Sequence, residues 1–476
     1  MKRRTRSKTR LAAAVVFILG SGSLGAQDHT INPKVNQVID AVSEERIAAI
    51  LNKLQGFGTR NIFSSQDDPT QGIGAARHWI YDQFKSYSPR LEVSFDVYHV
   101  KKNKTRLVRD VELQNVVAVL PGTVNPEHRI IISGHYDSVV IARRPQTETA
   151  TDGNGGGSGS NDGAQTPAEP LRFDLESKAP GANDDGSGIA AVLELARIMS
   201  QHEWKNTVVF IAFTAEEEGL VGSTLYARKA HKENQIIDAV LNNDIIGDDT
   251  SGDGRKNNVS ISLYSEEPAD SPSRELARYV KQACERYIPA MRVDLVFRQD
   301  RLGRGGDHIP FNQEGYAAVR FTAPEENYAN QHSVTDTVAN MSIPYAARAV
   351  RINAAALASL ASAPKKPVVE RQITREGKPV TITMLTRGKS RYDALLRWKN
   401  EKPEPDLAGY AVVVRSTTSP FWEREVYVGN VTEYLMKGAS IDDQIFGVKA
   451  IDKEGNASLV SVYNPRPRPP MEIETY

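Results

Sequence analysis

Hydrophobic residues recur at helical spacing along some stretches of the chain and form short β-branched or aromatic runs along others. The helical spacing predicts helices over 38–54, 74–84, 188–199 and 272–287. The short runs predict strands over 91–97, 116–120, 130–132, 207–213, 239–241, 259–263 and 317–321. Because strands alternate with helices, we expect an α/β domain with a mixed, largely parallel central sheet. Sites in such sheets gather at the carboxyl ends of the strands.

A second pattern begins after the Pro- and Lys-containing segment 361–367. The residues that follow predict strands alone, over 380–385, 392–398, 410–415, 426–428, 445–450 and 459–462. A series of short strands of this total length indicates an all-β sandwich, which we place at 366–465, before a Pro-rich tail over 466–476. The strands that carry Trp398, Tyr410 and residues 446–452 resemble those of a fibronectin type III domain.

The N-terminal residues have the pattern of an export signal. Six Lys and Arg residues and no acid precede residue 11, an apolar run follows over 11–19, and mostly small residues lead to Ala26. This order predicts a secretory signal peptide over 1–26. The apolar run is shorter than the ~20 residues that a membrane span needs. We therefore expect cleavage, export to the periplasm or the medium, no remaining membrane span, and an α/β catalytic domain over 27–362.

The amino-acid composition limits which partners and which metal ligands the chain can use. Lys and Arg together number 59, as do Asp and Glu, so no overall positive charge favours a nucleic acid partner. Cys284 is the single cysteine, which excludes a disulfide scaffold, a Cys-rich zinc module and an iron–sulfur cluster. A bound metal would therefore rest on histidines and carboxylates. The segment 143–179 includes a Gly-, Ser- and Asn-rich run and is expected to be a flexible insertion. A calcium loop there is the weaker hypothesis because no Glu closes an EF-hand pattern.

Histidines and carboxylates cluster at five places, most of them directly after predicted strands. They are His135 with Asp137, Asp184 with Asp185, Glu216 to Glu218, Asp244, and His332 with Asp336. Each has a structural explanation on its own, as a hydrogen-bonded loop, a helix cap or a solvated acidic turn. Gathered at one end of a sheet, two histidines and several carboxylates are instead suitable ligands for zinc. The sequence therefore favours a zinc centre.

The motifs around these residues resemble those of the family twenty-eight metallopeptidases, which include co-catalytic dizinc aminopeptidases. The segments concerned are Ser133–Ser138, Gly181–Gly188, Ala215–Ser223, Asn243–Asp244 and His332–Thr337, and they occur in the family order. The resemblance covers roughly residues 37–360. It implies a three-layer α/β/α zinc exopeptidase fold and a cis peptide bond between Asp184 and Asp185.

The resemblance implies a role for each matching residue. His135 and Asp244 would hold one Zn²⁺ ion, Glu217 and His332 would hold a second, and Asp184 would bridge the two. Asp137 would orient His135, and Glu216 would be the general base toward a metal-bridging water or hydroxide. Glu218 falls on a variable position and is expected to be exposed. Gln331 stands where some relatives have a tyrosine, so no oxyanion donor is assigned.

These roles predict an exported aminopeptidase that removes the N-terminal residue of peptides or proteins. A glutaminyl cyclase with a single zinc shares the fold, but Gln331 and the complete element over 183–188 count against it. A carboxypeptidase would need a cationic clamp, for which Arg301, Arg304 and Arg320 are candidates. A catalytically silent protein that adheres through its β-sandwich is disfavoured by the intact acid cluster. In the active enzyme, the β-sandwich is a candidate for contact with a surface or a polysaccharide.

Overall fold

The structure is a computed structural model of the chain. The described residues are 31–103, 106–142, 173–375, 377–400 and 402–464. The predicted signal peptide, residues 143–172 of the predicted insertion and the Pro-rich tail lie outside the described residues. Within the described ranges, no helix combines the length and the apolar character needed to cross a membrane.

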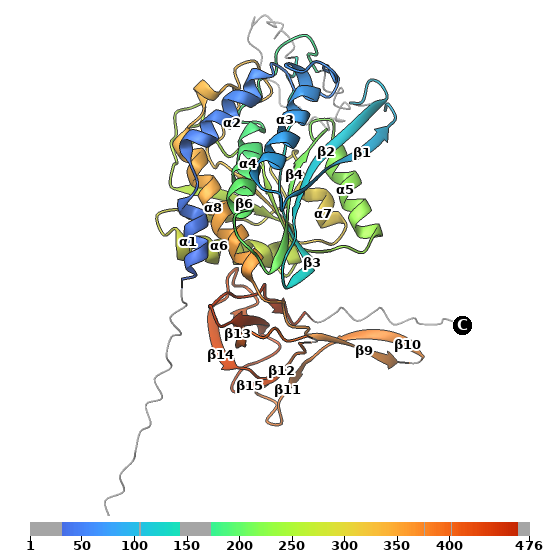
Figure 1. Cartoon of the computed structure of the whole chain (residues 1–476). Coiled ribbons are helices and arrows are strands. Elements are labelled where there is room, and N and C mark those ends of the chain that lie inside the picture. The colour runs from blue at the N-terminus through green and yellow to red at the C-terminus, as the bar shows by residue number, and fades with distance from the viewer. Residues whose placement is uncertain (1–30, 104–105, 143–172, 376, 401, 465–476) are drawn as a thin grey trace, which may run out of the picture.

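An eight-stranded mixed sheet forms the centre of the larger unit (Figure 1). Its strands are β1 (Glu92–Val100), β2 (Val111–Leu120), β3 (Asn125–His135), β4 (Asn206–Phe213), β5 (Ile236–Asn243), β6 (Ser260–Ser265), β7 (Arg292–Val296) and β8 (Ala318–Thr322). They lie in the order β1-β2-β4-β3-β5-β8-β6-β7. The neighbours β4, β3, β5 and β8 run parallel, so their carboxyl ends meet at one edge of the sheet, as predicted.

Helices cover both faces of this sheet. They are α1 (Pro33–Asp40), α2 (Glu44–Gly56), α3 (Gly72–Tyr87), α4 (Gly186–Met199), α5 (Val221–Lys232), α6 (Pro272–Tyr287), α7 (His308–Gln313) and α8 (Ile343–Ser362), and a 3₁₀ turn, η1, spans Val338–Asn340. Helices α5 and α7 pack on the face that presents Ile131 and Val209. The other helices share a core with Ile130 and Val208 on the opposite face. Alternation along the strands supplies both apolar faces, which confirms the three-layer α/β/α fold.

The prediction of one continuous helix over 38–54 is wrong. The chain forms two helices there, because α1 ends at Asp40 and α2 begins at Glu44. The Ser43 hydroxyl accepts a hydrogen bond from the Arg46 backbone N–H at 3.2 Å and so caps the start of α2. The apolar spacing continues on both sides of this break, so periodicity alone does not reveal it.

The C-terminal residues form an all-β unit, here called the β unit. Its strands are β9 (Glu370–Arg375), β10 (Lys378–Thr383), β11 (Leu385–Arg387), β12 (Ala394–Arg397), β13 (Leu407–Ser416), β14 (Arg424–Gly429), β15 (Glu433–Met436), β16 (Gln444–Asp452) and β17 (Ser461–Val462). The antiparallel sheets β11-β12-β15 and β14-β13-β16-β17 share a core that includes Leu396, Trp398 and Phe446. The all-β character is confirmed, and the likeness to fibronectin type III stays a prediction.

The β unit contacts the amino ends of the central strands. Glu404 accepts a hydrogen bond at 3.0 Å from Asn125, the first residue of β3. Lys205, directly before β4, lies 2.7 Å from the carboxylate of Asp452. In Figure 1 the β unit accordingly lies below the α/β domain.

Candidate metal centre

Four neighbouring parallel strands bring the predicted site residues to one edge of the sheet. These residues are His135 at the end of β3, Glu216 and Glu217 after β4, Asp244 after β5, His332 in the loop between β8 and α8, and Asp184 just before α4. Since the strands are adjacent and parallel, segments that are far apart in the sequence converge at their carboxyl ends.

Asp184 lies between the two histidines. Its Oδ1 atom is 3.2 Å from His135 Nε2, and its Oδ2 atom is 3.1 Å from His332 Nε2. A carboxylate that presents one oxygen toward each imidazole is placed to bridge two cations, as in known two-metal hydrolytic sites.

Two triplets of potential ligands share Asp184. One consists of His135, Asp184 and Asp244, and the other of Asp184, Glu217 and His332. Within each triplet, one ligand atom per residue lies within 4.8 Å of the others. Glu217 Oε2 is 3.1 Å from His332 Nε2, whereas Asp244 Oδ1 is 4.0 Å from His135 Nε2. The structure thus brings together all five predicted ligands.

Some buried atoms of this cluster have no hydrogen-bond partner among the described residues. They include Glu217 Oε1, Asp137 Oδ1 and His135 Nε2, the last of which lies 3.2 Å from Asp184 Oδ1 but without hydrogen-bond geometry. Leaving such an atom buried and unpaired costs roughly 1–3 kcal/mol. Imidazole nitrogens and carboxylate oxygens are zinc donors, so the unpaired atoms and the donor set both fit divalent cations of this type.

Burial and mutual repulsion shift the pKa values of the cluster. Burial raises the pKa of Glu216 well above the usual range, and the nearby Asp244 and Glu217 also raise it. Burial alone would lower the pKa of His135, but Glu216 and other carboxylates outweigh it and raise that pKa well above its ordinary value. The Glu217 carboxylate similarly raises the pKa of His332 to about 11. Concentrated shifts of this kind are typical of functional sites.

Asp137 touches one residue of each triplet. Its Oδ1 atom lies 3.6 Å from His135 Nδ1, and its backbone carbonyl is nearer to the same nitrogen, at 3.2 Å. Its Oδ2 atom accepts a hydrogen bond from the backbone N–H of Glu217 at 3.1 Å. The side chain is fully buried. Asp137 therefore fixes both the imidazole of His135 and the backbone that carries Glu217.

Asp185 and Asp336 belong to the predicted clusters but hold the backbone of the site in place rather than facing the two histidines. Asp185 caps α4 and accepts a hydrogen bond from the backbone N–H of His135 at 3.0 Å. Asp336 accepts the backbone N–H groups of Asn183 and Asp184 at 2.9 and 3.0 Å. The helix-cap explanation is thus correct for Asp185, while Asp184 faces the histidines. The peptide bond between these two aspartates is cis, as the resemblance implied.

Glu218 is not exposed, contrary to the prediction. Its exposed fraction is 4%, and neither carboxylate oxygen has a hydrogen-bond partner among the described residues. The carbonyl of Glu216 accepts the N–H groups of Gly219 and Leu220, so the acidic run forms a tight turn rather than an extended, solvated loop. Burial, together with Asp137 and Glu217, raises the pKa of Glu218 well above its usual range.

Arg320 cannot serve as the clamp for a substrate carboxylate. It is fully buried, with its guanidinium 3.1 Å from Asp244 and 3.0 Å from Asp300. It therefore holds the second oxygen of Asp244 in place. Asp300 lies in the loop after β7, and no local spacing in the sequence indicates that it pairs with a residue of β8.

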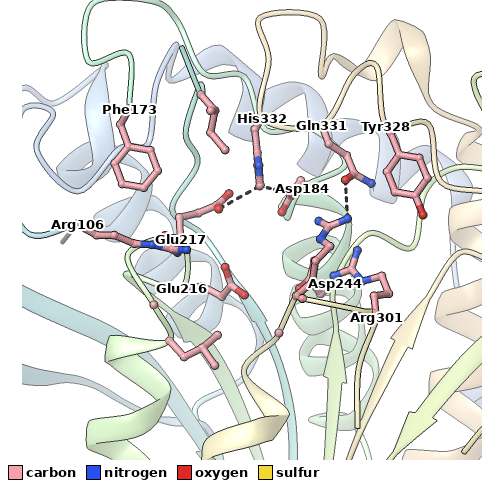
Figure 2. A pocket seen from close by; sticks show the side chains of 16 residues that line it. Arg106, Phe173, Asp184, Glu216, Glu217, Asp244, Arg301, Tyr328, Gln331 and His332 are labelled. Carbon is pink, nitrogen blue, oxygen red and sulfur yellow. Dashed lines mark hydrogen bonds and ion pairs between the residues drawn. The ribbon is translucent and has the colours of Figure 1, made fainter. Parts of the chain in front are cut away.

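A cavity of about 550 Å³ opens onto the cluster. Figure 2 shows Arg106 and Phe173 on the side of Glu217, and Gln331 and Tyr328 on the opposite side. The cavity is mixed in character, because the acidic cluster forms one part of its lining and arginines and apolar side chains form the rest.

Comparisons with known proteins agree with this geometry. The model of Peptidase family M28 matches residues 115–357, a segment that contains all the residues of the two triplets. A probable zinc metalloprotease of Pyricularia oryzae is 35% identical over 453 residues, covering 88% of this chain and 82% of the relative. One of Pyrenophora tritici-repentis is 32% identical over 457 residues, covering 89% and 86%. The crystal structure of LapB from Legionella pneumophila shares the fold, with a TM-score of 0.50, 20% identity and coverage of 69% and 75%.

Proposed function

This chain belongs to peptidase family M28, and from that premise we propose that it is a dizinc aminopeptidase that hydrolyses the N-terminal peptide bond of peptides or proteins. The observation that carries the proposal is the position of Asp184, with one oxygen directed at each histidine. The zinc metalloprotease names of the fungal relatives, which match the chain over most of its length, also support it.

The two triplets define which residues would hold the metals. His135 and Asp244 would bind one Zn²⁺ ion, Glu217 and His332 the other, and Asp184 both. When bound, the ions would supply Lewis acidity toward the scissile carbonyl and lower the pKa of a water toward about 7. The unpaired Nε2 of His135 and Oε1 of Glu217 would then have partners.

Glu216 is the proposed general base. It lines the cavity, and its Oε2 atom lies 4.0 Å from His135 Nε2. Glu216 forms a third group of potential ligands with His135 and Glu217, and we assign it as the base because the other two triplets, which share Asp184, already supply three ligands to each ion. Its burial and its acidic neighbours favour proton uptake, as an acceptor of the proton of the attacking water requires. Glu216 would then deliver this proton to the departing amine, which leaves as a neutral group.

The carboxylates of the cavity offer hydrogen-bond acceptors for a free amino group on the substrate. Asp184, Glu216, Glu217 and Asp244 all line it. Two bound Zn²⁺ ions would balance their charge, so an amino group would be held by a hydrogen bond to a carboxylate oxygen rather than by a net negative field. Two of the three lining arginines share one acidic partner: the guanidinium groups of Arg301 and Arg304 lie 2.7 and 3.3 Å from the carboxylate of Glu326.

Carboxypeptidase activity is the second candidate, and one observation favours it. Arg106 also lines the cavity, where it donates a hydrogen bond to the backbone carbonyl of Glu217 at 2.6 Å. A guanidinium group has five N–H donors, so the remaining ones could bind the terminal carboxylate of a peptide. A glutaminyl cyclase binds one zinc ion and would use only one of the two triplets, so the second triplet counts against this activity.

The decisive measurement compares three substrate sets on the purified protein. These are aminoacyl-p-nitroanilides, their N-acetylated counterparts, and N-blocked peptides with a free C-terminus, each before and after chelation and with zinc restored. We expect cleavage of the free-amine set alone, loss of cleavage on chelation, and recovery with two zinc ions per chain. Cleavage of the N-blocked peptides instead would establish a carboxypeptidase, and a single bound zinc with cyclisation of N-terminal glutamine would establish a cyclase.

We further propose that the protein is exported. This rests on the basic and then apolar residues over 1–19, which lie outside the described residues. N-terminal sequencing of the protein from its native cells should find a chain that starts near residue 27, in the periplasm or the medium. A cytosolic protein that still begins at residue 1 would contradict the proposal.

A further inference from the structure

The strands β9 and β10 form a ribbon that stands apart from both sheets of the β unit. They pair only with each other, from Glu370 opposite Thr383 to Arg375 opposite Lys378. Figure 1 shows the ribbon projecting away from the other strands. A two-stranded ribbon is at best marginally stable in water by itself, because it buries little apolar surface. This ribbon is held at its base, where the core residue Val369 precedes β9.

The register of the ribbon separates its side chains into two different faces. Residues directly opposite each other in an antiparallel pair point to the same side. One face, here called the basic face, presents the pairs Arg371 with Ile382, Ile373 with Val380, and Arg375 with Lys378. The other face presents Glu370 with Thr383, Gln372 with Thr381, and Thr374 with Pro379. All three cations and all three aliphatic side chains therefore lie on one side.

The basic face has no partner elsewhere in the described part of the chain. Arg371, Arg375 and Lys378 are exposed, and none forms an ion pair with another described residue. The aliphatic residues Ile373 and Val380 between them belong to none of the hydrophobic cores, and Val380 is 36% exposed. Aliphatic groups flanked by unpaired cations are the pattern of a surface that enters the headgroup region of an anionic membrane.

We propose that the basic face of the ribbon docks this protein on an anionic lipid surface. Its cations would approach the lipid phosphates while Ile373, Val380 and Ile382 enter the boundary between headgroups and acyl chains. The described residues of the ribbon contain no aromatic side chain on which a sugar ring could stack, so a polysaccharide fits this face less well. The chain as a whole has no excess of cations, so the attraction is local to the ribbon.

Binding of the full chain to vesicles tests this proposal. Phosphatidylcholine vesicles with and without phosphatidylglycerol should be sedimented with wild-type protein and with the variant R371Q/R375Q/K378Q. We expect binding that requires phosphatidylglycerol and is lost at high salt. The triple variant should bind roughly a hundredfold more weakly, since each basic residue near an anionic surface contributes about a fivefold factor. The matched control, R228Q/K232Q/K85Q, removes three exposed cations of the α/β domain and should bind like the wild type.

A second variant tests the aliphatic residues separately from the charges, so that a loss of binding can be distinguished from a change in folding. I373S/V380S keeps every charge, and it should weaken binding while leaving the dependence on salt unchanged. Peptidase activity on small substrates should be the same in all variants, because the ribbon belongs to the β unit, away from the metal centre. The proposal is overturned if wild-type protein ignores phosphatidylglycerol or if the triple variant binds as the wild type does. It is also overturned if light scattering shows that the basic face instead joins two copies of the chain, or if only a soluble anionic polysaccharide binds it.

Discussion

The two ends of the central sheet both bury charged side chains, but among the described residues it is the carboxyl-end cluster that contains charged atoms without a hydrogen-bond partner. At the amino end, Lys205 lies 2.6 Å from Asp406, 2.7 Å from Asp452 and 3.4 Å from Glu404. The remaining oxygens of Asp452 and Glu404 accept further hydrogen bonds, several of them from backbone N–H groups. At the carboxyl end, imidazoles and carboxylates face one another with atoms that have no described partner.

This difference indicates that the cluster at the amino end joins two parts of the protein and that the cluster at the carboxyl end binds a ligand. A buried charge network that is complete within the chain needs nothing more and here joins the β unit to the α/β domain. A network that is incomplete within the described chain persists because a ligand completes it or because its strain serves a reaction. The number of ion pairs does not distinguish the two clusters, whereas the number of unsatisfied atoms does.

The largest expected effect comes from the residue shared by both triplets. Asp184→Asn should reduce the bound zinc from two ions per chain to fewer than one and abolish peptidase activity, because each ion loses a charged ligand. Elemental analysis after dialysis and the shift of the melting temperature on adding zinc provide the measurements. Asp406→Asn makes the same chemical change at the amino end and should keep the full metal content. Normal zinc binding by Asp184→Asn would refute the bridging assignment.

The next largest effect is a difference in kcat between variants of two glutamates in the same turn. Glu216→Gln should lower kcat by about 100-fold to 10,000-fold, the usual contribution of a general base. Its zinc content should not change. Glu218→Gln replaces the more deeply buried carboxyl group of the turn, whose oxygens have no hydrogen-bond partner among the described residues, and it should stay close to wild-type kcat. Equal losses in the two variants would mean that burial of the acidic turn, rather than proton transfer, explains the effect.

At the amino end, removal of the central cation should affect stability and leave catalysis intact. Lys205→Met leaves Asp452 and Glu404 buried beside each other without a counter-charge. We expect a loss of about 3 kcal/mol in the free energy of unfolding, at the lower end for breaking a buried pair, because Lys205 keeps some contact with water. Chemical denaturation provides the measurement. Lys229→Met, which breaks an exposed pair with Asp96, should cost less than about 1 kcal/mol.

The sequence predicts that the metal-ligand residues lie close together, but it does not predict the contacts of the residues around them. His135, Asp244 and the acidic run at 216–218 each follow a buried strand, so the strand-end rule could bring them together without knowledge of the fold. The burial of Glu218 and the pairing of Arg320 with Asp300 depend on contacts between distant segments, which local spacing does not encode. For the same reason, the break before α2 and the separate ribbon of β9 and β10 were not predicted.

The smallest expected effect concerns His308, a buried histidine beside the centre that lies 3.7 Å from Asp300, a carboxylate already paired with Arg320. Burial lowers its pKa to about 4, and its Nε2 donates to the carbonyl of Gln299 at 2.8 Å. A histidine with a depressed pKa in the folded state stabilises the protein above its unfolded pKa of about 6.5, and this contribution is lost as the pH falls toward 4. At pH 5 the loss should be about 2 kcal/mol in the free energy of unfolding. His308→Gln keeps an N–H donor but cannot titrate, so its unfolding free energy, measured by denaturant from pH 7 to pH 4, should fall less steeply than that of the wild type. If the two curves of unfolding free energy against pH were parallel, the pKa of His308 would not differ between the folded and unfolded states. The burial of this histidine as a neutral group would then be wrong.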